Sequence, residues 1–443
     1  MKAKHLTGIV AIAVVAAMAL AFPLSAQGNG SGIRYVIIDL GTLGGTFGAG
    51  SSINNLGWSS GLAGTPDNNS FHAALWLPGR TVDLGTLGGT NSAVEWPVKN
   101  LRGNIVGISE TSTPDPLGES FSCAGFIPTN GTTCLGFLWH DGVMSPLPTL
   151  GGNNGFATGM NNFDQAVGWA ETTFHDPTCT GNQVLQFLAV IWGPRQGQIR
   201  PLLPLPRDSD TAATAINDLG QVVGISGICG DAIGAYSAKH AVLWQDDNPI
   251  ELPTLGGAGW NTPMAINNRG VVVGFSDLPG DASGGVLTPN FQAFLWTREG
   301  GIVNLSTLRG DVISEATGIN EEGQVIGTSF DADGNSRVFL WQNNTITDLN
   351  TLVAPGSASS LYLVSSGDIN DRGEITGQAC VLVDGACSAT THTFLAIPVR
   401  GNWATTKFAG DAAAKISVPE AVRRQILARY RFGHVGPEPV PAQ

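Results

Sequence analysis

The chain has 443 residues, with 60 Gly, 25 Pro and only 13% charged residues. Its formal net charge of −13 leaves few Lys and Arg side chains for phosphate groups, so nucleic acid and anionic lipid are not expected partners. The length suits one large repeat domain or two to three ordinary domains. Regularly spaced turn residues favour many short strands.

Residues 1–26 have the features of a secretory signal peptide. Lys2 and Lys4 form a basic start, residues 8–22 are mostly apolar, and small residues suited to cleavage follow. An uncleaved anchor is the alternative, but the apolar run is short for a membrane span. We therefore expect export to the periplasm, the cell surface or the medium, with no membrane span after cleavage. A Gly/Ser-rich linker follows at 27–34.

Three short signatures recur between residues 35 and 400, which indicates a repeat protein. One is a DLGTLGG-like run, the second is an apolar residue followed by Asn and a tight turn, and the third is an HAFLW-like run. The third ends in Trp in six copies and reads HTFLA, with Ala396, in the seventh. The repeated Asn occurs at intervals of 46 to 61 residues: Asn54, Asn100, Asn161, Asn217, Asn267, Asn320 and Asn370.

The HAFLW, DLGTLGG and IN-x-x-GQVVG signatures resemble those of the HAF family of bacterial extracellular repeat proteins. The resemblance covers roughly residues 35–400, and seven copies in register make it specific for the family. It implies a secreted repeat protein. It brings no activity and no catalytic motif that can be carried over to residues of this sequence.

Each repeat offers four strand-like segments of about five residues. We name them a (ending at the repeated Asn), b (after the turn), c (HAFLW-like) and d (DLGTL-like). The Asn and Gly of the a–b turn are residues that tolerate a positive φ. Seven four-stranded meanders over 35–400 predict an all-β fold, a seven-bladed β-propeller of antiparallel blades, with an open β-solenoid as the alternative.

The two ends of the repeat region carry complementary half-blades. The first strand, 35–43, is of the d type and has no c strand before it. The last strand, 393–399, is of the c type and has no d strand after it. We therefore predict that residues 36–42 pair with 393–399. This pairing closes the ring with the N-terminal strand and leaves no long unpaired edge.

Two side chains of the HAFLW-like run recur at fixed positions. The Trp is expected to pack between blades, with its indole N–H bonded to neighbouring backbone, and ligand binding is the alternative. His72, His240 and His392 share one strand position, so a structural role is favoured over catalysis. No GxSxG, HExxH or P-loop pattern occurs in the sequence.

The connections between strands b and c vary most in length. They include residues 110–135, 171–186 and 277–291, and in a meander they share one face with the d–a connections. Variable loops on a rigid scaffold often carry function. This loop-rich face is therefore the candidate binding face.

All six cysteines fall in b–c loops, and an even count in an exported chain suggests disulfides. Scattered His residues and the lack of a CxxC pair make a metal site the weaker alternative. Six cysteines allow fifteen pairings. The propeller arrangement selects Cys123–Cys134, Cys179–Cys229 and Cys380–Cys387.

Several residues are candidates for ligand contact. Trp96 and Trp260 follow d–a loops, where aromatic platforms at the channel mouth suit a sugar, with buried packing as the favoured alternative. Acidic residues of the long loops are further candidates, either for ligand binding or as an acid–base pair: Asp176, Asp231, Asp277 and Asp281.

A short acidic segment raises the question of calcium. Asp331, Asp333 and Asn335 are spaced like the start of a calcium loop, but the bidentate Glu downstream is missing. A plain turn is therefore favoured over calcium. No other cofactor is expected.

The repeat pattern ends at 400, and a tail follows at 401–443 with a predicted helix over 417–432. Ser417 and Glu420 suit a capping box. An apolar stripe lies along one side of this helix, and arginines cover the other. Docking of the helix onto the propeller is favoured over recruitment of a partner. The apolar stripe comprises Val418, Val422, Ile426 and Tyr430.

These features predict a secreted, monomeric binding or scaffolding module for an extracellular ligand, a glycan or a protein. The alternative is a lyase or hydrolase that acts on an extracellular polysaccharide, and a purely structural envelope protein is a third hypothesis. The channel mouth separates the first two. Converging carboxylates there favour an enzyme, whereas a filled or apolar mouth favours binding.

Overall fold

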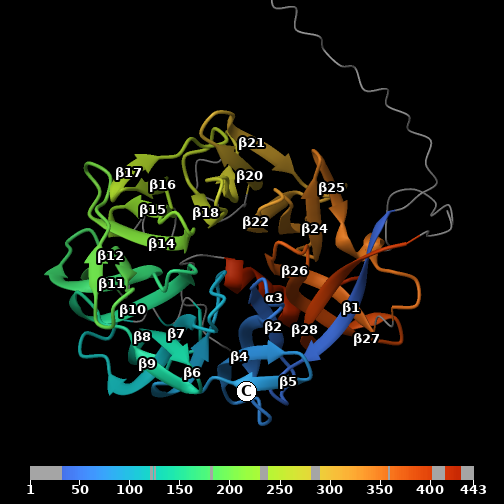
Figure 1. The fold of residues 1–443 in the computed structure, drawn as a ribbon, viewed down its shortest axis with the longest axis horizontal. Coiled ribbons are helices and arrows are strands. Elements are labelled where there is room, and N and C mark those ends of the chain that lie inside the picture. Colours follow the sequence, from blue (N-terminus) through green and yellow to red (C-terminus); the bar gives the residue numbers. More distant parts are fainter. Residues whose placement is uncertain are drawn as a thin grey trace, which may run out of the picture.

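Seven four-stranded antiparallel sheets stand around a central axis like the blades of a propeller (Figure 1). The predicted all-β, seven-bladed architecture is therefore confirmed, and the open solenoid is excluded. The predicted signal peptide, and the candidates Asp231 and Asp281, lie outside the described part of the chain. The computed structural model describes residues 32–119, 123, 126–179, 183–229, 238–280, 290–357, 360–401 and 415–430.

The first three blades follow chain order from the central axis outward (Figure 1). Blade 1 contains β2 (Gly48–Ile53), β3 (Ser59–Gly64), β4 (Phe71–Leu77) and β5 (Arg80–Asp83). Blade 2 contains β6 (Gly88–Ala93), β7 (Ile105–Pro114), β8 (Thr132–His140) and β9 (Val143–Pro146). Blade 3 contains β10 (Gly151–Met160), β11 (Ala166–His175), β12 (Leu185–Trp192) and β13 (Ile199–Pro201).

The next three blades repeat the same order. Blade 4 contains β14 (Asp210–Ile216), β15 (Val222–Gly227), β16 (His240–Gln245) and β17 (Asn248–Glu251). Blade 5 contains β18 (Asn261–Ile266), β19 (Val272–Asp277), β20 (Phe291–Thr297) and β21 (Gly301–Ser306). Blade 6 contains β22 (Ile313–Ile319), β23 (Val325–Phe330), β24 (Ser336–Gln342) and β25 (Thr345–Asp348), followed by a short 3-10 helix, η1 (Leu349–Leu352).

Blade 7 joins the two ends of the repeat region. β1 pairs antiparallel with β28, and Ile38 lies opposite Leu395. The pairing extends from Ile33 opposite Arg400 to Gly41 opposite Thr393, so the predicted closure of the ring is confirmed. The strands of this blade are β26 (Leu361–Ile369), β27 (Ile375–Val383), β28 (Ala386–Arg400) and β1 (Ile33–Gly41).

The outer strands are shorter than the DLGTL-like runs suggested. In blade 1 the outer strand ends at Asp83, and Gly85 and Gly88 then adopt positive φ values of 76° and 104°. This region of φ strongly favours Gly and turns the chain away from the blade. In blade 1 residues 84–87 are therefore a connection, while the preceding Asp83 ends β5 and the last two glycines of the run begin β6.

The seven repeated Asn side chains form a closed ring of hydrogen bonds. Each Nδ2 donates to the main-chain carbonyl of the corresponding Asn in the next blade, at 2.9 to 3.1 Å. The bond from Asn370 to Asn54 completes the circle across the junction of blades 7 and 1. A single side chain repeated in the sequence therefore links every blade to its neighbour.

The same Asn also builds its own turn. Asn217 Oδ1 accepts hydrogen bonds from the main-chain N–H groups of Leu219 (3.1 Å) and Gln221 (3.0 Å). The positive φ of this turn lies on Gly220, at 75°, and not on the Asn. The expectation that Asn is needed there for a positive φ was therefore wrong, because its side chain is what the turn requires.

The Trp of the HAFLW-like run packs between blades. The indole N–H groups of Trp192 and Trp244 donate to the carbonyls of Pro148 and Leu203, both at 2.8 Å. Each acceptor belongs to the connection that leaves the preceding blade. These two Trp residues are only 2% and 1% exposed, so they serve the core between blades, as predicted. Trp76 is also buried but its indole N–H has no hydrogen-bond partner among the described residues, and Trp139 and Trp341 are half-buried.

Three disulfides connect the b–c loops, and all three predicted pairings are confirmed. Cys123–Cys134 and Cys380–Cys387 each close a single loop, with sequence separations of 11 and 7. Cys179–Cys229 spans 50 residues and ties the loop of blade 3 to that of blade 4. Two bridges therefore act within a loop, and one acts between blades.

The C-terminal helix, α3 (Glu420–Tyr430), lies at the centre of the ring (Figure 1). It begins three residues later than predicted, and Glu420 pairs with Arg424 at 2.5 Å. Val422 and Ile426 are fully buried in the central apolar cluster. The helix therefore docks on its own propeller. Within the described residues, no helix has the length and apolar character needed to cross a membrane.

The Asn ring makes a testable prediction about stability. Asn217→Asp removes the Nδ2 donor and places a carboxylate beside the carbonyl of Asn267, so we expect a loss of about 2–4 kcal/mol in the free energy of unfolding. Urea denaturation measures it. Asn248→Asp, on the exposed β16–β17 turn, is the control and should change stability by less than about 0.5 kcal/mol. Equal effects of the two substitutions would contradict a structural role for the ring.

Candidate binding groove

The polar residues of two signatures meet each other across strands c and d. His72 Nδ1 lies 2.9 Å from the Asp83 carboxylate, and His392 Nδ1 lies 2.9 Å from that of Asp39. In blade 6 the same two positions hold Arg337 and an Asp, which pair at 3.0 Å. In blades 1 and 7 the repeated His is therefore the partner of the Asp in the DLGTL-like run, whereas His240 of blade 4 pairs with Asp208, in the connection from blade 3, at 2.9 Å.

Blades 2 and 3 replace this polar pair with apolar residues. The two positions hold Leu135 and Pro146 in blade 2. They hold Leu188 and Pro201 in blade 3. Neither Leu nor Pro has a side-chain donor or acceptor. The outer strands of these two adjacent blades therefore lack the polar link that the other copies use.

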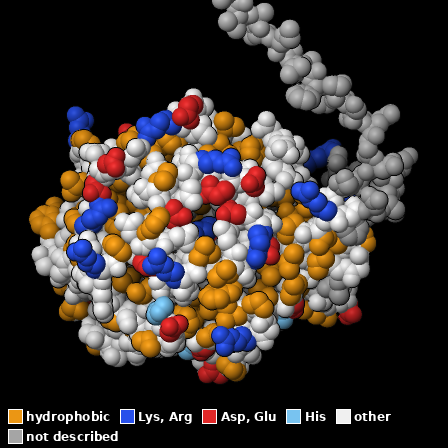
Figure 2. All heavy atoms as spheres, in the orientation of Figure 1, with side chains coloured by type: hydrophobic (Ala, Val, Ile, Leu, Met, Phe, Trp, Pro, Cys, Tyr) orange, Lys and Arg blue, Asp and Glu red, His pale blue; other side chains and the backbone are white. Residues whose placement is uncertain are grey.

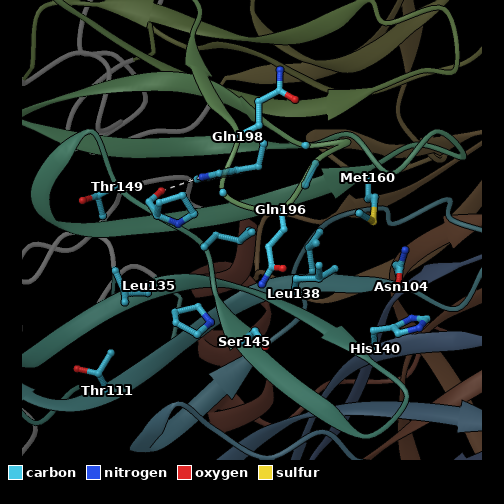
Figure 3. Close-up of a pocket in the computed structure, with 18 of the residues that line it drawn as sticks. Asn104, Thr111, Leu135, Leu138, His140, Ser145, Thr149, Met160, Gln196 and Gln198 are labelled. Carbon is cyan, nitrogen blue, oxygen red and sulfur yellow. Dashed lines mark hydrogen bonds between the residues drawn. The ribbon is translucent and has the colours of Figure 1, made fainter.

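A groove of about 1150 Å³ lies between blades 2 and 3 (Figure 3). One wall comes from β8 and β9, and includes Leu135 and Pro146. The other comes from β10, the end of β12 and the 193–198 hairpin of blade 3. The groove therefore forms at the place where the repeat has lost its polar pair.

Hydroxyl and amide groups are distributed along the apolar walls. Figure 3 shows Leu138 and Met160 together with Thr111, Ser145 and Gln196 around the groove. These neutral polar groups can donate and accept hydrogen bonds without a requirement for a charged ligand. The surface therefore suits a ligand that presents apolar groups and amide or hydroxyl groups along its length.

The two ends of the groove open on opposite faces of the propeller. Thr113, Pro114 and Pro116, near the b–c loop of blade 2, line the end on the loop-rich face. His140 and Arg195, in the c–d connections, line the other end. The groove thus crosses the rim of the molecule and reaches the predicted binding face at one end.

The central channel mouth on the loop-rich face is filled by the C-terminal segment. Val418, Val422 and Ile426 are each at most 1% exposed and pack in the same apolar cluster as Trp96 and Trp260. Of the two arrangements considered for the mouth, converging carboxylates or an apolar filling, the structure shows the apolar filling.

Neither aromatic candidate forms an exposed platform. Trp96 is 3% exposed and packs edge-on to Phe126 and Phe156, with ring centroids 5.3 and 5.5 Å away. Trp260 is 2% exposed and contacts Phe275 and Phe291. Both rings therefore belong to the packing under α3, the alternative weighed for them in the sequence.

The two described acidic candidates are also buried. Asp277 Oδ2 accepts the main-chain N–H of Trp260 at 2.6 Å and fixes the start of β18. Asp176 Oδ1 accepts the main-chain N–H and the hydroxyl of Thr178, both at 2.7 Å. Burial, and with it the neighbouring Asp176, raise the pKa of Asp210, whose side chain is fully buried. The structure thus brings two carboxyl groups together, but away from the groove.

The calcium-like segment anchors the C-terminal segment. Asp331 Oδ1 accepts the main-chain N–H groups of Asp333 (3.0 Å) and Asn335 (2.9 Å), which makes a compact turn. Asn335 Oδ1 then accepts the N–H of Val418 at 2.9 Å, and the Asp333 carbonyl accepts Arg423 at 2.9 Å. In the described part of the chain no three His, Cys, Asp or Glu residues are arranged to hold a metal ion.

An ion-pair network strengthens this anchor. Lys415 Nζ lies 2.9 Å from Asp311, whose side chain is fully buried. Arg337 bridges the same Asp311, at 2.8 Å, to Asp348, at 3.0 Å. The segment that leads into α3 is therefore fastened to blade 6 by charge as well as by apolar contact.

Sequence reasoning did not identify the groove. Most of its lining comes from strands and short connections, and the long b–c loop of blade 2 contributes only at one end. The signal was present in the repeat alignment, because two consecutive copies carry Leu135 and Leu188 where other copies carry a polar residue. The sequence does not show that the His at this position pairs with an Asp of strand d, and without that contact the two Leu residues have no evident consequence.

Comparisons with known proteins add little beyond the fold. No protein-family model and no curated protein matches the sequence. A *Pyrococcus horikoshii* acylaminoacyl peptidase is similar in structure, with a TM-score of 0.42, 10% identity, and coverage of 78% of this chain and 52% of that one. A prolyl endopeptidase has a TM-score of 0.46, 8% identity and coverage of 81% and 50%. This chain thus spans about half the length of either peptidase.

A third similar structure is a gluconolactonase, XC5397 from *Xanthomonas campestris*. It has a TM-score of 0.34 and 8% identity, with coverage of 84% of this chain and 99% of that one. Identities this low are compatible with a shared fold and carry no information about activity.

The buried Asp210 predicts a dependence of stability on pH. Burial raises its pKa from 3.8 to about 8, so the folded chain keeps a proton that the unfolded chain loses above pH 3.8. Stability should therefore fall as pH rises from about 4 to about 8, by up to about 1.4 kcal/mol per unit. Asp210→Asn should flatten this slope in urea titrations at several pH values. An unchanged slope would contradict the assignment.

The docking of α3 can be tested with neighbouring residues. Val422→Glu places a charge in the central apolar cluster, and we expect a loss of about 3 kcal/mol or more together with release of the helix. Ala421 is exposed, so Ala421→Glu is the matched control and should leave the helix docked. Limited proteolysis after residue 415 reports release. Equal protection of both variants would show that α3 does not depend on this contact.

Proposed function

We propose that this chain is an exported HAF-repeat protein that acts as a binding module, and that it holds an extended polypeptide segment in the groove between blades 2 and 3. The observation that carries the proposal is the groove itself. It occurs where blade 2 departs from the repeat pattern, with Leu135 and Pro146 lining the groove in place of a polar pair.

The size and lining of the groove favour a polypeptide. A volume of about 1150 Å³ exceeds the usual range for a site that encloses a small molecule. Hydroxyl and amide groups between the apolar side chains match the alternation of backbone N–H and C=O groups with side chains in an extended peptide. Ends on both faces allow a chain to pass through without a terminus in the groove.

A glycan is the less favoured ligand. Sugar-binding sites commonly place aromatic rings against the faces of the sugar, as was considered for Trp96 and Trp260. Trp192 carries the one phenyl, phenol or indole ring among the described lining residues, and this side chain is 2% exposed. The groove therefore offers no stacking platform.

The enzyme alternative, a lyase or hydrolase, also finds less support in the groove. Asp164 is the one carboxylate among the described lining residues, and it is ion-paired with Arg102. Its Oδ1 also accepts hydrogen bonds from Asn100, at 2.9 Å, and Asn104, at 2.8 Å. A carboxylate held in this way is a poor general base, because each donor stabilises its ionised form.

The lining of the groove and the net charge of the chain also indicate which partners to expect. We expect an extracellular protein ligand, no nucleic acid, and a monomeric binding module without a bound cofactor. Scaffolding remains part of the proposal, because a groove open on both faces leaves the rest of the ring free for other contacts.

The test compares two substitutions at one repeat position. Leu135→Arg places a charge in the groove, whereas Leu188→Arg makes the same change in blade 3, outside the groove lining. Random linear peptides displayed on phage are selected on the unaltered chain, and a glycan array is probed in parallel. We expect peptide binding that Leu135→Arg weakens at least about tenfold, or about 1.4 kcal/mol, and that Leu188→Arg leaves unchanged.

Two outcomes would count against the proposal. Selected peptides that bind both variants equally would place the site elsewhere. Binding to glycans without any peptide binder would favour the polysaccharide hypothesis over the polypeptide one.

A further inference from the structure

The b–c loop of blade 2 is fastened to blade 3 by a buried carboxylate. Glu119 Oε1 accepts the main-chain N–H groups of Val184, at 2.9 Å, and Leu185, at 2.6 Å. Glu119 is 3% exposed, and its Oε2 is buried without a hydrogen-bond partner. The loop thus docks through one carboxylate oxygen, while the other is left unsatisfied.

A second buried carboxyl group lies beside this contact. Glu171, fully buried at the end of β11, shares a donor with Glu119. Gln183 Nε2 lies 3.3 Å from Glu119 Oε1 and 3.1 Å from Glu171 Oε1. Glu171 Oε2 accepts the main-chain N–H groups of Asn153, at 3.0 Å, and Asn154, at 2.8 Å. One side-chain amide therefore bridges two acidic groups from different blades.

The charges around this pair are all of one sign. Asp115, from the same loop as Glu119, accepts Asn154 Nδ2 at 2.7 Å. Among the described residues, no Lys, Arg or His donates a hydrogen bond to Glu119 or Glu171. Burial, and then the charge of Glu119, raise the pKa of Glu171 to about 7. Two carboxylates this close cannot both be ionised in a buried site without a penalty.

The contact lies at the loop-face end of the groove. Pro114 and Pro116, on either side of Asp115, line the blade 2 wall there. Gly152 and Asn153 line the blade 3 wall, and Asn153 donates to Glu171. The carboxyl pair therefore joins the two walls of the groove at one end.

Blade 3 carries a similar acidic pair, but a covalent bond restrains it. Asp176, in the b–c loop of blade 3, lies close enough to Asp210 of blade 4 to raise the pKa of that buried carboxyl group, together with burial itself. Cys179–Cys229 ties the same loop to blade 4. In contrast, Cys123–Cys134 closes the blade 2 loop on itself and leaves its attachment to blade 3 noncovalent. The pair of Glu119 and Glu171 is therefore free to separate, because no disulfide ties its loop to blade 3.

We propose that a proton held by Glu171 locks the b–c loop of blade 2 onto blade 3, and that loss of this proton at alkaline pH releases the loop and opens the loop-face end of the groove. When Glu171 ionises, its proton goes to solvent. Two carboxylates, Glu119 and Glu171, then share the single amide donor of Gln183. The repulsion is relieved when Glu119 leaves Val184 and Leu185. The meaning of this switch for ligand binding rests on the proposed function of the groove.

Amide hydrogen exchange of the full chain, without ligand, tests the switch. Protection factors of Val184 and Leu185, corrected for the intrinsic effect of pH, are measured from pH 6 to 9. We expect protection to fall about tenfold per pH unit above about 7. Glu119→Gln keeps the accepting oxygen and removes the charge, so protection should persist to pH 9. Glu171→Gln is the second variant, in case the first does not fold.

The acidic pair of blade 3 provides the control. The loop that contains Asp176 should keep its protection across the same range while Cys179–Cys229 is intact. A fall in protection at Val184 and Leu185 that is the same in Glu119→Gln as in the unaltered chain would overturn the proposal.

Because this measurement uses no ligand, it is independent of the peptide selection. Failure of the Leu135→Arg comparison would reject the groove as a binding site and leave the loop switch intact. Failure of the exchange experiment would reject the switch and leave the groove.

Discussion

The closed ring of Asn side chains is the contact on which the architecture depends. Each Nδ2 spans from one blade to the backbone of the next, and Asn370 returns to Asn54. Since each Asn also fixes its own a–b turn, the same side chain sets the geometry within a blade and the spacing between blades. Loss of one member leaves a buried carbonyl without its donor, which explains why seven copies with variable loops keep this one residue.

The proposed binding groove lies where one repeat loses the polar pair between strands c and d. In most copies the polar side chain at the His position of strand c pairs with a polar side chain on or near strand d, as His72 does with Asp83. Blades 2 and 3 carry Leu and Pro at these two positions, and in blade 2 both residues line the groove. The loops that looked most variable in the sequence have a different task. They carry disulfides, cover the central cluster and, through Glu119, fasten one blade to the next.

The fold could be predicted because its determinants are local and repeated. Seven copies of one signature gave the number of blades, and the half-blades at 35–43 and 393–399 gave the closure. The cysteine pairs followed from loop positions. The site could not be predicted in the same way, because it depends on which side chains face each other across strands. For Trp96 and Trp260 the sequence favoured buried packing over a surface platform, and the structure confirms that both are buried, in the apolar cluster that also contains residues of α3.

The pairing of β1 with β28 also governs how the polypeptide can mature. The strand made first has no partner until the strand made more than three hundred residues later emerges, since Ile33 and Arg400 are opposite each other. Throughout synthesis the early strand keeps an unpaired edge that can aggregate or be bound by chaperones. A chain that terminates before β28 cannot close the ring. Only chains that include both β1 and β28 can therefore reach the closed, folded state.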